Sequence, residues 1–331
     1  MPKTPQRISY FDFIRGIAII MVVAIHTTTS CNIDSICGTI STIIRQCLNC
    51  AVPLFLASSA FFLAKIDIST FDKYFTFLKR QVPKIYIPTL IWSIPCIAYP
   101  IYSGSNLIYQ LILLFCCACS IYYFIALIIQ YYLLLPIFKK SPKIALGLSI
   151  PTTIASLIIY TKISINNPLP LILYAGIFPF WILYFVLGLY LANTRRSYSL
   201  IIPITLIILG VISQYIELYH INSIYNELRL GIKISTPLYS SGIILLLFSK
   251  KIESMYNNIS NGSILNFFEH IGKKSFIIYL SHCYIISIVR GIYYTNFWSF
   301  NFLVCFILSI IFISFLEKIT PKSIHKYIGF K

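Results

Sequence analysis

Ten stretches of mostly apolar residues run along this 331-residue chain, and most approach the roughly 20 residues that a helix needs to cross a membrane. A soluble fold cannot bury them all, because 58% of the residues are hydrophobic and only 11% are charged, against about 25% charged in a typical soluble domain. The sequence therefore predicts an all-α integral membrane protein, with residues 1–331 forming one transmembrane domain and no appended soluble domain. The expected spans are Phe13–Thr29, Ile43–Ala64, Ile85–Ser103, Ile121–Phe138, Ile144–Tyr160, Leu173–Asn193, Leu200–Leu218, Pro237–Ser249, Phe276–Ile292 and Phe300–Leu316.

Two further segments need an interpretation of their own. Asn106–Cys119 is apolar, and it is either an interfacial helix or an early start of the fourth span. The hydrophilic segment Lys250–Ser275 is expected to be a cytoplasmic connection with a turn near Asn257–Gly262. We expect no cleavable signal peptide, because the first span contains charged and titratable residues and no small-residue cleavage site follows it.

The basic residues indicate the orientation of the spans. Lys and Arg number 26 against 9 Asp and Glu, a formal net charge of +17. With the N-terminus inside, twenty of them fall in cytoplasmic segments, as cytoplasmic loops of membrane proteins require. Both chain ends are then cytoplasmic, and the charge is accounted for by topology and by anionic lipid rather than by nucleic acid. The outer loops hold Lys162, Arg229 and Lys233, and the spans themselves hold Arg15, Arg45 and Arg290.

The ten cysteines predict neither a disulfide framework nor a metal site. Most lie in or beside apolar runs, where cysteine acts as a small apolar residue. Cys47 and Cys50 have the C-x-x-C spacing, but no second Cys or His pair lies near them in the sequence, so we expect no metal there.

The first span carries three ionisable side chains, and such residues inside a membrane indicate a functional site by default. Asp12 and Arg15 lie three residues apart, so they share a helix face and can pair. Arg15 and His26 are separated by about three full turns, so both point the same way at about 16 Å from each other along the helix axis. A cavity lined by both Arg15 and His26 would explain why both lie on one helix face inside the membrane. The alternatives are an Arg15 that only snorkels beside Asp12 and a His26 that only links two helices.

Two other spans carry candidate site residues. In the ninth, Ser275 is expected to cap the helix start, and Tyr279 and His282 share a face. In the second, Arg45 lies near the outer end, and Pro53 is expected to kink the helix. The alternatives are a purely structural Tyr279–His282 pair and an Arg45 that only snorkels.

A basic stretch precedes the third span. Lys79, Arg80 and Lys84 stand at its cytoplasmic mouth, just before Pro88. Three cations there suit the phosphates of a cofactor. The alternative is that these three residues only reflect the excess of Lys and Arg that is usual in cytoplasmic loops.

Together these residues resemble the acyltransferase 3 family of multi-pass membrane O-acyltransferases. The resemblance extends from about residue 8 to residue 315, and its first and last motifs are the most specific. The chain departs from the family pattern at Ala60, where glycine is usual, at Tyr123, where tryptophan is common, and at Pro83–Lys84, which interrupts a paired-arginine spacing. The matching segments are Asp12 with Arg15-Gly16-Ile17-Ala18 and His26, Val52 to Ala60, Lys79-Arg80 to Pro88, Tyr123 to Pro136, Phe185 to Gly188, and Gly272 to His282.

The resemblance implies transfer of an acyl group, usually acetyl from acetyl-CoA, to a hydroxyl of a cell-surface glycan or its lipid-linked precursor. It implies a multi-pass protein of the bacterial cytoplasmic membrane, with acyl-CoA, a saccharide acceptor and membrane lipids as partners and no metal. In length the chain is similar to the enterobacterial-common-antigen type of O-acetyltransferase in that family. Because His26 is expected in the outer half of the first span, we predict a cytoplasmic donor and an extracytoplasmic acceptor.

Carried over to this sequence, the resemblance gives His26 as the general base and Arg15 as the ligand of the donor phosphates. Asp12 orients Arg15, and we count all three as catalytic. Arg80 and Lys84 assist in binding the donor. Arg45, Tyr279 and His282 contact the acceptor or line its cavity. An acyl-histidine intermediate and direct transfer are both compatible with these residues.

Two other classes of protein fit the same composition. A polysaccharide or small-molecule exporter also combines about ten helices with a few buried charges, but the two halves of this chain show no paired repeat of broken helices. A purely structural membrane subunit leaves the Arg15 and His26 pair unexplained.

Overall fold

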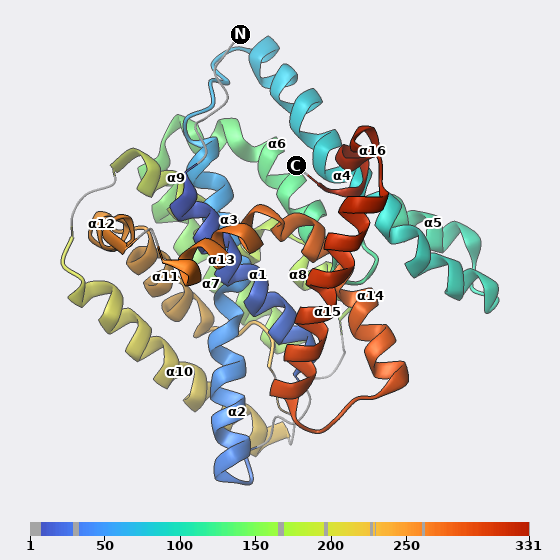
Figure 1. Ribbon diagram of the computed structural model, residues 1–331. Helices are drawn as coiled ribbons and strands as arrows, with labels where there is room; N and C mark the ends of the chain where they lie inside the picture. The colour runs from blue at the N-terminus through green and yellow to red at the C-terminus, as the bar shows by residue number, and fades with distance from the viewer. Residues whose placement is uncertain are drawn as a thin grey trace.

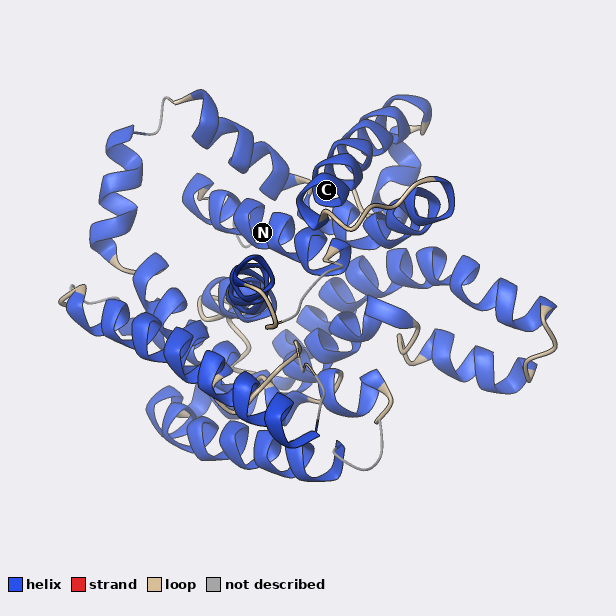
Figure 2. Ribbon diagram, turned by 90° about the horizontal axis from the view of Figure 1, so that it is seen from below, coloured by secondary structure: helices blue, strands red, loops and turns tan. Residues whose placement is uncertain are grey.

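The chain folds into a bundle of helices. In the computed structural model, every regular element among the described residues is a helix (Figure 1, Figure 2). The structure describes residues 8–28, 33–164, 169–194, 198–225, 228, 230–259 and 262–330. Several residues of the predicted charge sorting lie outside this described part of the chain, namely Lys3, Arg7, Arg195, Arg196, Arg229 and Lys331.

Within the described residues, eight helical segments are long and apolar enough to cross a membrane, which confirms the predicted all-α membrane protein. Each overlaps one of the expected spans. They are α1 (Ser9–Thr27), the composite segment Ile36–Leu63, α4 (Phe71–Tyr102), the composite segment Ser120–Lys140, α7 (Pro142–Ser164), α10 (Ile201–Tyr225), α14 (Ser275–Ile292) and α15 (Trp298–Ile319).

The expected sixth and eighth spans contain shorter helices. The 13 residues of α9 (Ile182–Thr194) and the 12 residues of α11 (Thr236–Leu247) extend for about 20 Å and 18 Å, against about 30 Å of hydrocarbon. Before α9 the chain forms only α8 (Leu171–Ala175) and the 3₁₀ turn η3 (Phe178–Phe180). One continuous helix over Leu173–Asn193 was therefore the wrong prediction, because Pro179 in η3 has no N–H to continue a helical ladder.

The second span is interrupted rather than kinked. It consists of α2 (Ile36–Cys47), the 3₁₀ turn η1 (Leu48–Cys50) and α3 (Ala51–Leu63). Pro53 lies in the first turn of α3, where its missing N–H costs no hydrogen bond. The predicted irregularity is thus present, and it takes the form of a helix break just before the proline.

The third span begins at Phe71 instead of Ile85. Thr70 caps it, since its Oγ1 accepts a hydrogen bond from the backbone N–H of Lys73 at 3.4 Å. The last helix of the chain, α16 (Lys322–Ile328), packs beside α4, where Nε1 of Trp92 donates to the carbonyl oxygen of Ile328 at 3.0 Å.

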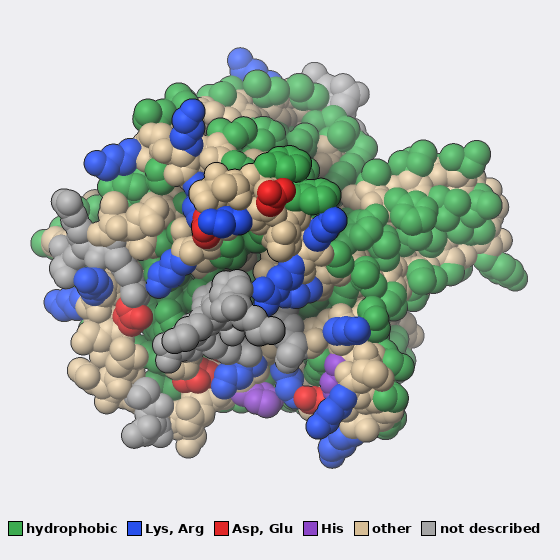
Figure 3. Space-filling model, turned by 90° about the horizontal axis from the view of Figure 1, so that it is seen from above, with side chains coloured by type: hydrophobic (Ala, Val, Ile, Leu, Met, Phe, Trp, Pro, Cys, Tyr) green, Lys and Arg blue, Asp and Glu red, His purple; other side chains and the backbone are tan. Residues whose placement is uncertain are grey.

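The apolar segment after α4 is a separate helix, α5 (Leu107–Phe115). Asn106 caps it by accepting from the backbone N–H of Tyr109 at 3.1 Å. Cys117 and Ser120 both have a φ of 51°, a left-handed conformation that ends a helix. An early start of the fourth span is therefore wrong. That span begins with η2 (Ser120–Tyr122) and continues as α6 (Tyr123–Lys140). The last part of α4 projects from the bundle together with α5 as an apolar arm (Figure 1, Figure 3).

The expected cytoplasmic connection contains two helices, α12 (Lys250–Ile259) and α13 (Ser263–Lys273). Residues 260 and 261 of the expected turn lie outside the described residues. The backbone of α13 lies directly against that of α1. A Cβ on Gly272 would come within 1.7 Å of the carbonyl oxygen of Asp12, and a Cβ on Gly16 within 2.0 Å of that of Phe268. The segment is therefore part of the helix bundle as well as a connection.

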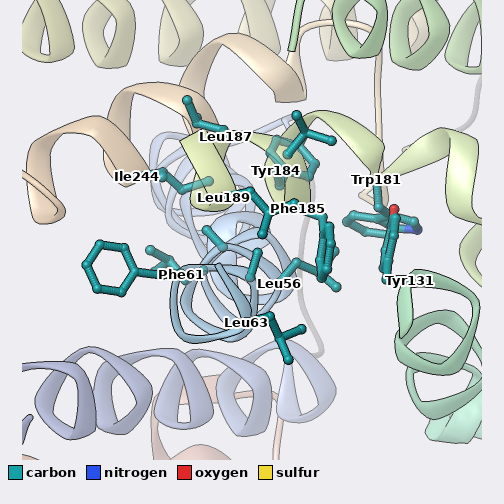
Figure 4. Packing of buried hydrophobic residues seen from close by; sticks show 14 of the residues in the cluster. Leu56, Phe61, Leu63, Tyr131, Trp181, Tyr184, Phe185, Leu187, Leu189 and Ile244 are labelled. Atoms are coloured by element: carbon teal, nitrogen blue, oxygen red, sulfur yellow. The ribbon is translucent and has the colours of Figure 1, made fainter. Parts of the chain in front are cut away.

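The main hydrophobic core lies between α3, α6, α9 and α11 (Figure 4). A Cβ on Gly188 of α9 would lie 2.3 Å from the carbonyl oxygen of Ala57 in α3, so these two helices also approach through their backbones. The rings of Tyr131 and Phe185 stack at 4.3 Å between centroids. This core holds α3 and α6 rigidly as two walls of the cavity described below.

The contact between α1 and α13 can be tested by adding one methyl group. Gly272→Ala is expected to destabilise the protein by about 1–3 kcal/mol, because the new Cβ overlaps a carbonyl oxygen. Gly147→Ala in α7 is the matched control, since nothing lies within 4 Å of its Cβ position, and alanine is the better helix former. Thermal melting in detergent measures the stability of both variants. Equal melting temperatures for the two variants would contradict the contact.

Candidate functional site

A cavity of about 180 Å³ lies inside the bundle between α1, α3, α4, α6 and α14. Its wall is mostly aliphatic and aromatic with few polar groups, which is usual for small-molecule sites. It is lined by Arg15, Val22, Val52, Phe55, Ser59, Ile85, Ile121, Tyr123, Phe124, Ile125, Ile128, Tyr132, Gly272, Lys273, Ser275, Phe276 and Tyr279.

Arg15 gives this cavity a polar end. Its Nη1 lies 3.5 Å from Oδ1 of Asp12, so the ion pair predicted from the spacing is present. The guanidinium also lies over the ring of Phe62, 5.1 Å from its centroid. The side chain of Asp12 is 1% exposed and that of Arg15 is 28% exposed. The carboxylate therefore holds Arg15 from within the protein while part of the guanidinium is accessible from the cavity.

The junction of α13 and α14 forms an adjacent part of the wall at this end. Lys274 has a φ of −98° and a ψ of 6° there, and α14 starts at Ser275. Ser275 is thus the first helical residue, and its expected role as a cap is wrong. It lines the cavity together with Gly272 and Lys273. The first N–H groups of α14 have no partner within the helix, and they add partial positive charge to that of Arg15 and Lys273.

His26 lies close to His282 in space. The two rings are 5.3 Å apart between centroids, and the ring of His282 is 6.3 Å from that of Tyr279, which lines the cavity. Nδ1 of His282 lies 3.1 Å and 2.9 Å from the carbonyl oxygens of Ile278 and Tyr279. Because carbonyls only accept, Nδ1 carries the hydrogen and Nε2 is left as an acceptor. Nε2 lies 3.6 Å from Sγ of Cys283.

The ring of His26 forms no hydrogen bond with the residues that the structure describes. Arg15 lines the cavity directly, whereas His26 adjoins it through His282 and Tyr279. Tyr279 is fixed in place, since its hydroxyl donates to the carbonyl oxygen of Ile121 at 2.7 Å. The structure thus brings together the polar faces of α1 and α14.

One arginine contacts the His26 backbone, and a second acts on its ring from further away. Nη2 of Arg290 donates to the carbonyl oxygen of His26 at 2.9 Å, and its guanidinium lies 5.1 Å from the ring centroid of Tyr294. Arg45 is within electrostatic reach of the His26 ring. Its Nη1 donates to Oδ1 of Asn49 at 2.7 Å. The sequence placed Arg290 inside a span but gave it no role.

Arg80 and Lys84 lie four residues apart on α4, and both are exposed. Neither lines the cavity, although Ile85, the residue after Lys84, does. Figure 3 shows Lys and Arg side chains gathered on the face that carries the start of α4. The expected donor-binding residues Arg80 and Lys84 are thus not part of the cavity wall.

A buried lysine, Lys233, lies near Arg45. Lys233 precedes α11 and is 2% exposed. Its Nζ donates to Oε1 of Gln46, the residue next to Arg45. Burial lowers the pKa of Lys233 to about 7, a shift that Arg45 reinforces and Glu217 opposes.

Several residues of the cavity wall were not singled out from the sequence. Lys273 and Ser59 lie within motifs that were recognised, so their neighbours gave a signal. Phe55 and Tyr132 also lie within matching segments, but aromatic residues are frequent throughout this chain and the sequence does not show which of them face inwards.

Comparison with known protein families decides the assignment. A family model described as an acyltransferase domain matches residues 8–317, nearly the whole chain. The chain belongs to the acyltransferase 3 family. No curated protein and no solved structure matches it. The protein is thus a membrane acyltransferase, and its cavity, with cationic groups at the Arg15 end and two histidines near Tyr279, is the candidate active site of this acyltransferase.

The buried lysine predicts a pH dependence of the acyltransferase's stability. Between about pH 7 and pH 10.5 the unfolded chain binds more protons at Lys233 than the folded chain does, so stability rises with pH across this window. Lys233→Met should remove that rise, while Lys162→Met, at an exposed lysine of α7, should keep it. Melting in detergent at several pH values measures the slope. A slope unchanged by Lys233→Met would show that Lys233 does not cause it.

Proposed function

We propose that this membrane acyltransferase transfers an acetyl group from acetyl-CoA to a hydroxyl of a cell-surface glycan or its lipid-linked precursor. The observation that carries the proposal is one cavity with cationic groups at one end and a pair of histidines beside the other. The proposed donor matches this arrangement, because its anionic phosphates fit the cationic end of the cavity and its thioester, far from the phosphates, reaches the histidines.

The Arg15 end suits the donor phosphates. Arg15, Lys273 and the first N–H groups of α14 surround it, and phosphates bind readily at helix N-termini beside cations. Asp12 keeps the Arg15 guanidinium oriented. Arg80 and Lys84 are exposed on α4, where they attract the polyanionic donor. The apolar middle of the cavity then takes the uncharged arm that ends in the thioester.

His26 serves as the general base. A sugar hydroxyl is a poor nucleophile at neutral pH, and a positioned imidazole that takes its proton accelerates the attack. The hydroxyl oxygen bonds to the thioester carbon, the bond from that carbon to sulfur breaks, and the coenzyme leaves as a thiol after taking up a proton. Tyr279 and His282 line the path of the acyl group and contact the acceptor. An acyl-histidine on His26 is the alternative route to the same product.

The distribution of charge supports a cytoplasmic donor and an extracytoplasmic acceptor. The face of Figure 3 with the many Lys and Arg side chains carries the start of α4, and basic residues of multi-pass proteins gather on the cytoplasmic side. Arg15 is near this side, while His26 lies about 16 Å further along α1. The protein then resides in the bacterial cytoplasmic membrane, and its membership of an acyltransferase family favours this function over export.

Replacement of His26 tests the assignment of the base. His26→Ala is expected to lower the acetyl-transfer rate by about 10²–10⁴-fold, the usual contribution of a general base, without loss of protein from the membrane. His220→Ala, at an exposed histidine of α10, is the control and should be fully active. The readout is radioactive acetyl transferred to membrane glycan. Retained activity in His26→Ala would remove His26 from the reaction.

The sidedness of the donor can be tested in sealed vesicles. Inverted vesicles expose the cytoplasmic face, so acetyl-CoA added outside them should acetylate glycan, and the same addition to right-side-out vesicles should not. Permeabilising the right-side-out vesicles should restore the reaction. Acetylation in intact right-side-out vesicles would place the donor site on the other face.

A further inference from the structure

Three aromatic side chains form a row in the wall of the cavity. Phe55 comes from α3, Phe124 from the start of α6 and Tyr279 from α14. The rings of Phe55 and Phe124 lie 6.2 Å apart between centroids, and those of Phe124 and Tyr279 lie 5.8 Å apart. Both pairs meet edge to face, an arrangement that aromatic rings favour. We call these three residues the aromatic row.

The aromatic row lies toward the end of the cavity that is away from Arg15. On α1 the cavity wall includes Arg15 and Val22, which are two turns or about 10 Å apart along the helix axis. Phe55 and Tyr279 pack against the hydrophobic cluster that contains Val22. On α3, Phe55 likewise lies about 10 Å along the axis from Phe62, whose ring lies under the Arg15 guanidinium. The cationic groups and the aromatic row thus occupy different ends of one cavity.

The two histidines lie just beyond the aromatic row. The ring of His282 is 6.3 Å from that of Tyr279, and the ring of His26 is 5.3 Å from that of His282. On α1, His26 follows Val22 by one turn and lies on the same face of the helix. A donor whose phosphates bind at the Arg15 end therefore brings its acyl group to the aromatic row when its thioester reaches His26.

The rings of the aromatic row are fixed in place. The hydroxyl of Tyr279 donates to the carbonyl oxygen of Ile121 at 2.7 Å. Phe55 packs against two hydrophobic clusters at once, and Phe124 lies between its two neighbours in the row. Protein interiors are close-packed and resist displacement of their side chains. An acyl group that is too long for the space at the row therefore meets rings that do not readily move.

We infer that the aromatic row sets the length of the acyl group, so that the enzyme accepts acetyl and discriminates against longer acyl chains. The inference rests on the proposed function and specifies the donor that the same site selects. An apolar wall distinguishes acyl chains by their size, and one methylene group in a hydrophobic pocket changes kcat/KM by about 10–200-fold. The methyl group of acetyl is the smallest apolar end that such a wall can receive.

Donors that differ only in acyl length test the inference. Membranes that contain the full-length protein are given radioactive acetyl-CoA, propionyl-CoA or butyryl-CoA, and transfer of label to membrane glycan is followed. Initial rates at low donor concentration give the relative kcat/KM of the three donors. We expect kcat/KM for butyryl-CoA to be about a hundredfold or more below that for acetyl-CoA, with propionyl-CoA between them, because the extra methylene groups meet the row.

Two variants of α6 form a matched pair for this test. Phe138 is buried against Tyr131 and Phe185 in the main core and is not part of the cavity wall. Phe124→Leu and Phe138→Leu each remove one ring from the interior, but only the first removes it from the aromatic row. We expect Phe124→Leu to raise the butyryl-to-acetyl ratio of kcat/KM by about tenfold or more, and Phe138→Leu to leave it unchanged. Phe55→Leu, on a different helix, should raise the ratio in the same direction.

The outcomes distinguish this inference from the function on which it rests. Equal kcat/KM for the three donors in the unmodified protein would overturn the role of the aromatic row and leave acyl transfer standing. The same conclusion follows if Phe138→Leu raises the ratio as much as Phe124→Leu, or if both row variants reach the membrane at normal levels and keep the original ratio. Failure to transfer any of the three acyl groups to membrane glycan would overturn the proposed function and the inference with it.

Discussion

The backbone contact between α1 and α13 is the constraint on which the site depends. Gly16 and Gly272 face each other so closely that neither position has room for a Cβ. Because small residues allow this approach, the α13–α14 junction comes to lie beside Arg15, and Lys273 and Ser275 reach the same cavity. A larger residue at either glycine separates the cationic groups that the proposed donor site requires.

The other end of α1 is fixed by side chains rather than by backbone packing. Arg290 and Tyr294, from α14 and the residues just after it, bond the carbonyl oxygens of His26 and Thr27. Helix C-termini leave such carbonyls without intrahelical partners. The same interactions that satisfy the end of α1 therefore place a cation next to the histidine, so the stability of the helix end and the electrostatics of the site are linked.

The sequence was sufficient to locate most of the spans, from their apolar length, and to predict the first polar face, from the helical period. Apolar length predicts spans wherever they are, and the spacing of Asp12, Arg15 and His26 fixes their common face on any helix. The break before α9 was missed because an apolar run looks the same with or without an interruption, even though Pro179 lies within it.

Contacts between distant segments could not be derived in this way. The packing of α13 against α1 depends on two glycines about 250 residues apart. Each lies in a recognised motif, but neither motif shows that the two glycines meet. The position of Arg290 beside His26 likewise depends on how α14 crosses α1. Such pairings are set by tertiary structure, and the sequence alone located Arg290 only within a span.

The two histidines differ in a way that bears on their roles. His282 is buried and its Nδ1 is committed to backbone carbonyls, which fixes its tautomer and ring. The ring of His26 has no such commitment within the described chain, and it is only partly buried. A base must approach the hydroxyl and release its proton afterwards, which requires a free nitrogen and some access. His26 meets both requirements, whereas His282, with one nitrogen bound to the backbone and the other beside Cys283, is better suited to position the acyl group or its acceptor.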